Sequence, residues 1–337
     1  MESIWSQTCR LRQREAQPGD MKTDIAVIGA GMAGILIASA LQEAGRRVVV
    51  LEAKRIAGGQ TRNTTAKLTC QHGLLYEKLI RTLGREKARQ YAQANAAALM
   101  EYRRIIADRN IDCDLEQRDA WAYGSNAAQL RKEAEAAAAL GLPATFVEET
   151  KLPFPTAGAV RFANQAQFHP LKFLQAISEP LTIYENTSVQ SVEEDQIVTT
   201  RGRVQAEQIV FACHYPFVNF PGMYFARMHQ ERSYVIALEN AARMDGMWIG
   251  AEQGAYSFRN YGPLLLLGAG ATAAGRTAPA AAMIFCGSRR PGGFRAAGKW
   301  PIGRPRTASR RTAFPTSAPT PPAGPIGSWP PAFRNGA

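Results

Sequence analysis

Residues 23–34, with the sequence TDIAVIGAGMAG, decide the fold of this chain. The first half is a short β-branched apolar run, which predicts a buried parallel strand, and the second half is a GxGxxG turn. A helical pattern follows over Ile35 to Ala44, and Arg47 to Leu51 predicts a second strand that ends at Glu52. This order of strand, glycine turn, helix, strand and acid predicts a βαβ unit that binds a dinucleotide.

The glycines and the acid of this unit each have a physical role. Gly29 permits the tight turn off the strand, Gly31 lets the backbone approach a pyrophosphate, and Gly34 lets the helix pack closely on the strand. The helix N-terminus presents unpaired amides to the phosphates, and Glu52 can accept hydrogen bonds from ribose hydroxyls. A glycine turn without a cofactor is the alternative, which the complete context disfavours. The residues expected to bind the cofactor here are Gly29, Gly31, Met32, Ala33, Gly34, Glu52 and Ala53.

A polar loop directly after the second strand favours FAD over NAD as the dinucleotide. Residues 58–69 read GGQTRNTTAKLT, and their hydroxyl and amide side chains can line phosphates and ring edges. A nicotinamide dehydrogenase would more usually continue with another βα repeat, and a solvated loop is the alternative interpretation of these residues. We therefore expect FAD, with Gln60, Thr61, Thr64 and Thr65 on its phosphate and ring side, and an NAD-dependent dehydrogenase is the rival.

Glu52 followed by residues 58–64, GGQTRNT, resembles the FAD-dependent oxidoreductases of the D-amino-acid oxidase and glycine oxidase type. The chain is most similar to the bacterial subgroup whose members often carry an added Rieske iron–sulfur domain. Residues 2–5, ESIW, and residues 256–262, YSFRNYG, fit that subgroup too. The resemblance covers residue 1 to the neighbourhood of Ala271, which is most of the chain.

The resemblance implies an α/β fold in which a Rossmann-type FAD-binding domain is interleaved with a mixed-sheet substrate domain. It implies FAD as cofactor and oxidation of a small amine or amino-acid-like substrate by hydride transfer to the flavin. The backbone near Val189 would contact the adenine, and the strand end at Ala212 would return to the cofactor, although His214 stands where the family often has glycine. The transfer requires no protein acid or base, so no catalytic residue is assigned. Besides the substrate, the implied partner is an electron acceptor or a Rieske-type domain outside this chain.

The chain divides into four expected parts. They are an N-terminal extension at 1–22, the FAD-binding domain at 23–80 and 181–222, the substrate domain at 81–180 and 223–271, and a tail at 272–337. Apolar periodicity predicts helices over 76–110 and 127–140 and another that His169 and Pro170 open. The expected strands are 114–123, 181–184, 188–192, 196–200, 204–207, 208–214, 224–238 and 254–267.

Two of these strands carry alternating polar and aromatic residues. An arginine that faces the flavin can pair with a substrate carboxylate, and a tyrosine can close the pocket. A solvated sheet face with aromatic cross-strand pairs is the alternative for each residue. The substrate-binding candidates are Arg232, Tyr234, Tyr256 and Arg259.

Composition indicates a globular, cytoplasmic protein. No apolar stretch approaches the roughly 20 residues of a membrane span. The N-terminus carries Arg10, Arg12 and Arg14 without an apolar core, unlike a signal peptide. The five cysteines lack CxxC spacing, which favours reduced thiols over a zinc or disulfide framework, so neither a metal site nor a membrane partner is expected.

The tail differs in composition from the rest of the chain. Residues 272–337 hold ten Lys and Arg residues, no Asp or Glu, and eleven of the twenty prolines. Read one base earlier, the tail can encode ITPDGVPYIG and WVVATGFQKWGM, which resemble family segments in order. We therefore predict an irregular frameshift product and no nucleic-acid-binding patch, since regular aromatic interleaving is missing. A catalytically inactive fragment is thus a second rival to an active oxidoreductase.

Overall fold

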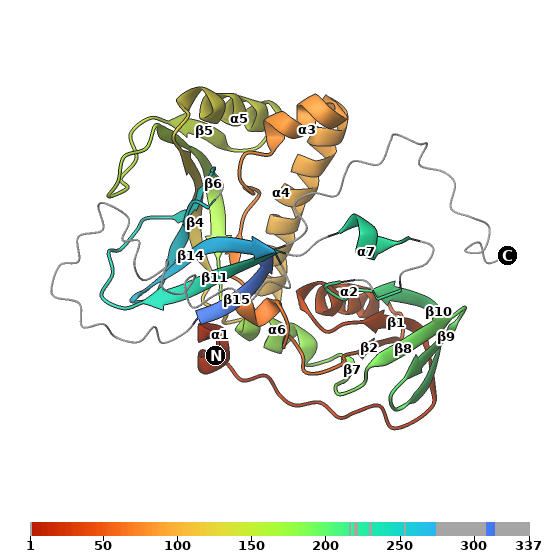
Figure 1. Cartoon of the computed structure of the whole chain (residues 1–337). Helices are drawn as coiled ribbons and strands as arrows, with labels where there is room; N and C mark the ends of the chain where they lie inside the picture. Colours follow the sequence, from red (N-terminus) through yellow and green to blue (C-terminus); the bar gives the residue numbers. More distant parts are fainter. Residues whose placement is uncertain are drawn as a thin grey trace.

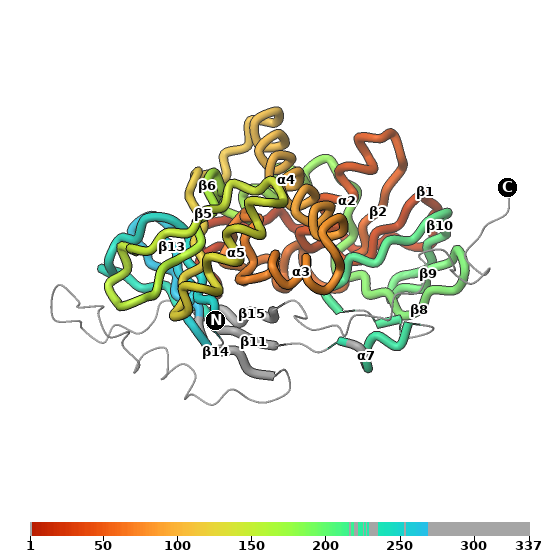
Figure 2. The backbone as a smooth tube through the Cα atoms, turned by 90° about the horizontal axis from the view of Figure 1, so that it is seen from above, coloured from red at the N-terminus to blue at the C-terminus, as the bar shows by residue number. Residues whose placement is uncertain are grey.

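The computed structural model describes residues 2–215, 217–218, 222–228, 231–252, 254–273 and 308–313, of which 225, 227, 231–234, 269–273 and 308–313 are described by backbone alone. Two β-sheets lie toward opposite ends of the molecule, with the long helix α4 (Arg85–Asp108) between them (Figure 1, Figure 2). One sheet is of the Rossmann type and the other is mixed, so the expected α/β fold class is confirmed.

The first sheet contains the predicted βαβ unit. β1 (Met21–Ile28) pairs in parallel with β2 (Val48–Leu51), and α2 (Met32–Glu43) connects the two strands. Alternate residues of β1 and β2 enter two different hydrophobic clusters, as expected for strands covered on both faces. α2 begins at Met32, earlier than predicted, because Gly31 caps it in an extended conformation.

The other strands of this sheet complete the order β7-β2-β1-β10-β9-β8. They are β7 (Thr182–Tyr184), β8 (Val189–Glu193), β9 (Gln196–Thr199) and β10 (Gly202–Phe211). The prediction of two strands at 204–207 and 208–214 is wrong. β10 is a single strand because it pairs in parallel with the whole of β1.

The second sheet has the order β15-β11-β14-β13-β12-β4-β6-β3, and β5 pairs with β6. Its strands are β3 (Lys67–Leu68), β4 (Glu116–Gly124), β5 (Ala144–Val147), β6 (Gly158–Gln167), β11 (Glu231–Leu238), β12 (Met247–Gly250), β13 (Ser257–Tyr261), β14 (Leu264–Ala273) and β15 (Ala308–Ala313).

Three expectations about this sheet are corrected. The strand predicted over 224–238 begins as the short helix α7 (Tyr224–Arg227), which follows Met223 in a left-handed conformation. The strand predicted over 254–267 is the hairpin of β13 and β14, because Gly262 turns the chain with a φ of 53°. Within the tail, Ala308–Ala313 are not irregular but pair with β11 as the edge strand β15. Most of the remaining tail lies outside the described residues.

Three helices pack on one face of the mixed sheet, in a shared hydrophobic cluster. The single helix predicted over 76–110 is two helices, α3 (Tyr76–Leu83) and α4, because Gly84 adopts a φ of 80° between them. α5 (Ala127–Ala139) forms as predicted, with Asn126 as its N-cap. Its buried Glu133 accepts hydrogen bonds from three backbone N–H groups at the start of α3, those of Leu75, Tyr76 and Glu77.

Replacing Glu133 with alanine is expected to lower the free energy of unfolding by about 3 kcal/mol, because three buried N–H groups lose their acceptor. Urea denaturation of the purified protein measures this loss. Glu135→Ala, on the exposed face of the same helix, is the matched control and should change stability by less than about 0.5 kcal/mol. Equal effects of the two variants would contradict a capping role for Glu133.

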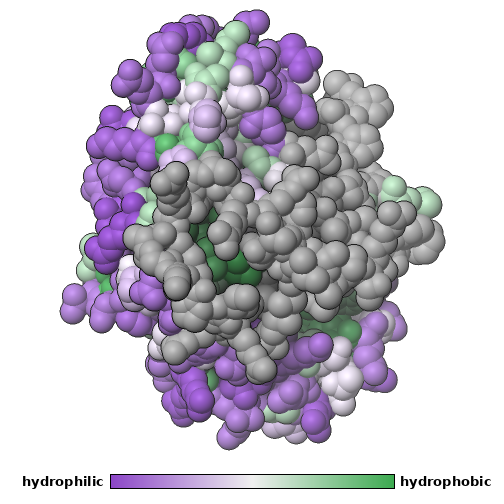
Figure 3. Space-filling model, turned by 60° about the vertical axis from the view of Figure 1, so that its left-hand side comes forward, coloured by the Kyte–Doolittle hydropathy of each residue, from purple (hydrophilic) through white to green (hydrophobic). Residues whose placement is uncertain are grey.

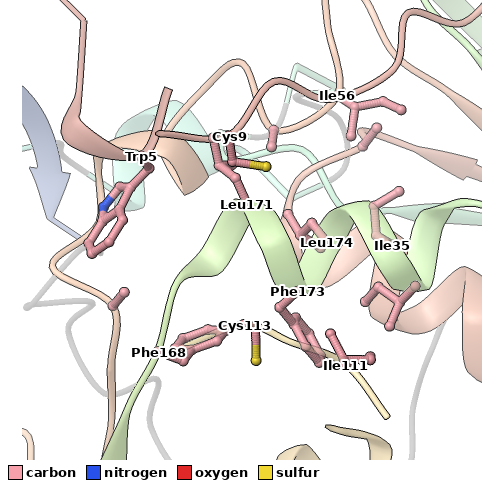
Figure 4. Close-up of a cluster of buried hydrophobic side chains, with 14 of the residues drawn as sticks. Trp5, Cys9, Ile35, Ile56, Ile111, Cys113, Phe168, Leu171, Phe173 and Leu174 are labelled. Carbon is pink, nitrogen blue, oxygen red and sulfur yellow. The ribbon is translucent and has the colours of Figure 1, made fainter. Parts of the chain in front are cut away.

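The N-terminal extension runs from beneath the mixed sheet to the start of β1 (Figure 1). It begins with α1 (Ile4–Thr8), whose Trp5 is buried in the same hydrophobic cluster as α6 (Pro170–Ser178) and α2 (Figure 4). The same cluster includes residues of β11 and β14, so the extension shares a core with both the first sheet's helix and the mixed sheet. The domain limits expected from the sequence stay a prediction. α6 lies in the expected substrate part, yet it packs against α2 of the expected FAD-binding part.

Candidate cofactor and active site

The turn between β1 and α2 has room only for glycine at two positions. Gly29 has a φ of 106°, and a Cβ atom there would lie 3.0 Å from the carbonyl oxygen of Ala212. At Gly34 a Cβ atom would lie 1.9 Å from the carbonyl oxygen of Gly29, so the helix and the strand end are in direct backbone contact. The turn is held from behind, since the N–H of Gly29 donates to the Leu51 carbonyl at 2.8 Å. The start of α2 can therefore approach a pyrophosphate closely.

Glu52, at the end of β2, is fixed beside this turn. Its Oε2 accepts from the Ala30 N–H at 2.8 Å, and its Oε1 accepts from the Lys54 N–H at 2.9 Å. Its carbonyl oxygen accepts from the N–H of Thr187 at 2.9 Å, two residues before Val189. The remaining lone pairs of the half-buried carboxylate can accept hydrogen bonds from ribose hydroxyls. Ala53 follows as an exposed residue.

The polar loop returns to the same turn through Thr61. Thr61 Oγ1 accepts from the N–H of Met32, the first residue of α2, at 3.0 Å, and Thr61–Asn63 form a short 3₁₀ helix. Gln60 is half-buried and Thr65 is 3% exposed. Gly29, Gly31, Glu52 and Thr61 thus converge on the carboxyl edge of the first sheet. This glycine-lined cradle, with the N-terminus of α2 and one carboxylate, fits the pyrophosphate and ribose of FAD.

The loop continues into the mixed sheet through Lys67 of β3, which the sequence reasoning missed as a site residue. Its Nζ donates to the carbonyl oxygen of Trp248 at 2.8 Å and to Ser257 Oγ at 2.5 Å. The signal available in the sequence was a basic residue two positions after Thr65, within the same polar loop. Lys67 therefore joins the expected cofactor loop to one face of β13.

Arg259 lies on that same face of β13, two residues after Ser257. Its side chain is 1% exposed, one Nη donates to the carbonyl oxygen of Phe168 at 3.3 Å, and its Nε has no hydrogen-bond partner. Among the described residues no carboxylate forms an ion pair with it. Burial lowers the pKa of Arg259 to about 9, so the guanidinium is charged at neutral pH. It is a buried cation that no carboxylate of the described residues contacts directly, and Glu116 acts on it only at longer range.

Of the other substrate candidates, Tyr256 does not join Arg259. Tyr256 packs against the hydrophobic cluster on the opposite face of the sheet, and its carbonyl oxygen accepts from the Tyr123 hydroxyl at 2.9 Å. Backbone register places Arg232 opposite Thr272 and Tyr234 opposite Ala269, while the side chains of Arg232 and Tyr234 lie outside the described structure. Tyr256 and Arg259 are three positions apart, so strand alternation places their side chains on opposite faces of the sheet.

A buried polar network adjoins this face. His169 is fully buried, its Nδ1 accepts from the Lys172 N–H at 3.3 Å, and its Nε2 lies 2.9 Å from Thr8 Oγ1. Because Nδ1 is an acceptor, the neutral ring carries its proton on Nε2. Asp114 accepts from both Lys172 Nζ at 2.8 Å and the Tyr261 hydroxyl at 2.9 Å. Burial, partly opposed by Asp114, lowers the pKa of His169 to about 4.

Acid is expected to weaken the folded state through His169. Its folded pKa of about 4 lies below its ordinary value of 6.5, so the unfolded chain binds more protons between these pH values. Stability should fall as the pH drops from 6.5 to 4, by at most about 3 kcal/mol. Urea denaturation across this range measures it. His169→Asn keeps an N-cap that does not titrate and should lose less; equal slopes would contradict the assignment.

Residues 24–290 match the sequence family of FAD-dependent oxidoreductases designated DAO. The chain belongs to this family. FAD is the cofactor of this family, which sets aside the NAD-dependent rival. The family match extends past Ala271, the expected composition boundary.

A curated relative gives a similar result. YhfW of Bacillus subtilis (strain 168) is named as a Rieske 2Fe-2S iron–sulfur protein. It is 34% identical to this chain over 271 residues, which cover 77% of this chain and 53% of the relative. The chain therefore spans about half the length of that relative. This agrees with the resemblance to the Rieske-linked subgroup.

Solved structures share the fold at low sequence identity. Glycine oxidase from Geobacillus kaustophilus has a TM-score of 0.65 and 16% identity, with 87% of this chain and 83% of that chain covered. NikD, an amino acid oxidase of nikkomycin biosynthesis, has a TM-score of 0.65 and 16% identity, with 88% of this chain and 83% of that chain covered.

No helix within the described ranges is long and apolar enough to span a membrane. On the face shown in Figure 3, the described residues are mainly hydrophilic.

Proposed function

We propose that FAD lies across the carboxyl edge of the first sheet. Its pyrophosphate would rest on the amides of Ala33 and Gly34 and beside the Thr61 hydroxyl that the Met32 N–H holds, and its ribose would donate to Glu52. The adenine would lie beside Val189, and Gln60 to Thr65 would follow the phosphate and the ring. The glycine cradle and the fixed carboxylate of Glu52 support this placement.

We propose further that the substrate is a small amine with a carboxylate, of the amino-acid type. The observation that carries this proposal is Arg259, a fully buried guanidinium with an unpartnered Nε. A buried charge without a counter-ion is unfavourable, so a substrate carboxylate would complete the site. Arg259 would bind and orient the substrate, and Lys67 would hold the cofactor loop against β13. Bound FAD would accept a hydride from the carbon that bears the amine.

The names of the relatives agree with this substrate class. Glycine oxidase and an amino acid oxidase are among the proteins with the same fold. A Rieske-type iron–sulfur domain as electron acceptor is likewise a proposal, supported by the name of the Bacillus relative.

Anaerobic reduction of the bound flavin tests the proposed substrate class. The purified full chain, loaded with FAD, is mixed with glycine or proline and, as matched controls, with methylamine or pyrrolidine, which lack the carboxylate. Amino acids should bleach the oxidised flavin spectrum at least tenfold faster than the matched amines, an effect of about 1.4 kcal/mol. Equal rates within each pair would contradict the role of Arg259. Flavin that binds but is reduced by neither class would support the inactive-fragment alternative.

A further inference from the structure

Trp5 is a buried residue on a five-residue helix at the chain's N-terminus, yet it touches the cofactor loop. Its side chain is 1% exposed, and its Nε1 donates to the carbonyl oxygen of Thr64 at 2.8 Å. Thr64 belongs to the loop that we expect on the ring side of FAD. Figure 4 shows Trp5 at one end of the buried cluster formed with α6, apart from the helix that carries Ile35.

The same indole also contacts Arg259, the residue proposed to bind the substrate carboxylate. The guanidinium carbon of Arg259 lies 5.3 Å from the centre of the Trp5 ring. A cation over an aromatic face at this distance is attracted by the ring quadrupole. The ring also makes edge contacts with His169 at 4.9 Å and Tyr261 at 4.8 Å between ring centres. One side chain therefore fixes both the cofactor loop and Arg259.

Other residues attach the N-terminal segment independently of Trp5. Cys9 Sγ donates to Gln175 Oε1 at 3.3 Å, the N–H of Arg14 donates to Glu185 Oε2 at 3.1 Å, and the N–H of Gln17 donates to Thr187 Oγ1 at 3.1 Å. A change at Trp5 can therefore be separated from loss of the whole segment.

We propose that Trp5 is a positioning residue of the active site. Its N–H holds the Thr64 carbonyl and its ring holds the Arg259 guanidinium, which fixes the separation between the flavin-facing loop and the carboxylate-binding group. This inference rests on the proposed function. It makes residues 2–8 part of the functional site, although they lie far from it in sequence.

Two variants separate the two contacts. Trp5→Phe keeps an aromatic face for Arg259 but removes the N–H donor, and Trp5→Leu removes both. Trp121→Phe, at a tryptophan that stacks on Trp248 in the mixed sheet, is the matched control. Each full-length protein is titrated with FAD, and the FAD-loaded protein is then titrated with benzoate as carboxylate probe and with benzamide as its neutral counterpart.

Trp5→Phe should weaken FAD binding about fivefold and shift the visible flavin spectrum, with nearly unchanged benzoate affinity. Trp5→Leu should weaken FAD binding similarly and also weaken benzoate binding about tenfold, while benzamide binding stays the same. Trp121→Phe should change none of these. Thermal midpoints measured without ligand separate these effects from general destabilisation.

The inference is overturned if both Trp5 variants match the wild-type protein in FAD affinity, flavin spectrum and benzoate affinity. It is also overturned if benzoate and benzamide lose affinity equally in Trp5→Leu, since that shows a structural effect without selectivity for charge. If the wild-type chain binds no FAD, the proposed function and this inference both fall. If the wild-type protein binds FAD and both Trp5 variants behave like it, the inference alone falls.

Discussion

Gly34→Ala is expected to weaken FAD binding at least about 100-fold, which corresponds to about 2.7 kcal/mol. A Cβ atom at residue 34 would lie 1.9 Å from the carbonyl oxygen of Gly29, so α2 must move away from the end of β1. That movement withdraws the amides of Ala33 and residue 34 from the pyrophosphate. The same overpacking should lower the free energy of unfolding by about 3 kcal/mol. FAD titration and urea denaturation measure the two effects.

Gly268→Ala is the matched control for this substitution. It makes the same chemical change in β14, where a Cβ atom would lie 3.5 Å from the Ser257 carbonyl oxygen, an ordinary contact distance. FAD affinity should be unchanged in this control. Retention of wild-type affinity in Gly34→Ala would mean that the cofactor does not use the start of α2.

Arg259→Met is expected to abolish the preference for a carboxylate ligand. Benzoate should bind at least about 100-fold more weakly to the FAD-loaded variant, because buried hydrogen bonds to a charged group are worth about 1.5–3 kcal/mol each. Benzamide binding should change little. The thermal midpoint without ligand should stay the same or rise, because methionine replaces a buried charge that has no carboxylate partner in the described structure.

The exposed Arg118, which pairs with Glu116, supplies the control Arg118→Met. Benzoate affinity should be unaffected by this loss of a surface charge. Similar weakening of benzoate in both variants would indicate a general electrostatic effect. A large drop in stability of Arg259→Met with unchanged benzoate binding would assign Arg259 a structural role.

The cofactor cradle could be predicted from sequence because its residues are close together in the chain. Gly29, Gly34 and Glu52 act through local backbone geometry, which a short spacing pattern captures. The contact of Trp5 with Arg259 could not be predicted in this way, since it depends on how the N-terminal helix packs against a distant strand. The break at Gly84 was missed because apolar periodicity continues on both sides of it.

The frameshift of residues 272–337 stays a prediction. Sequencing the DNA across codons 265–337 tests it, and one additional cytosine at the Ala271 codon is the expected result. The present reading frame confirmed without change would refute the frameshift, and the tail would then be a native part of this chain.

The proposed cofactor site is tested most directly by equilibrium titration with FAD. The purified full-length wild-type chain and Gly34→Ala are titrated side by side, and the quenching of flavin fluorescence reports binding. We predict saturable binding of one FAD per chain by the wild-type protein, with a Kd of about 1 μM or tighter, and binding at least about 100-fold weaker by Gly34→Ala. Absence of FAD binding by the wild-type chain, or equal binding by the two proteins, would contradict the proposal that the glycine cradle holds the cofactor.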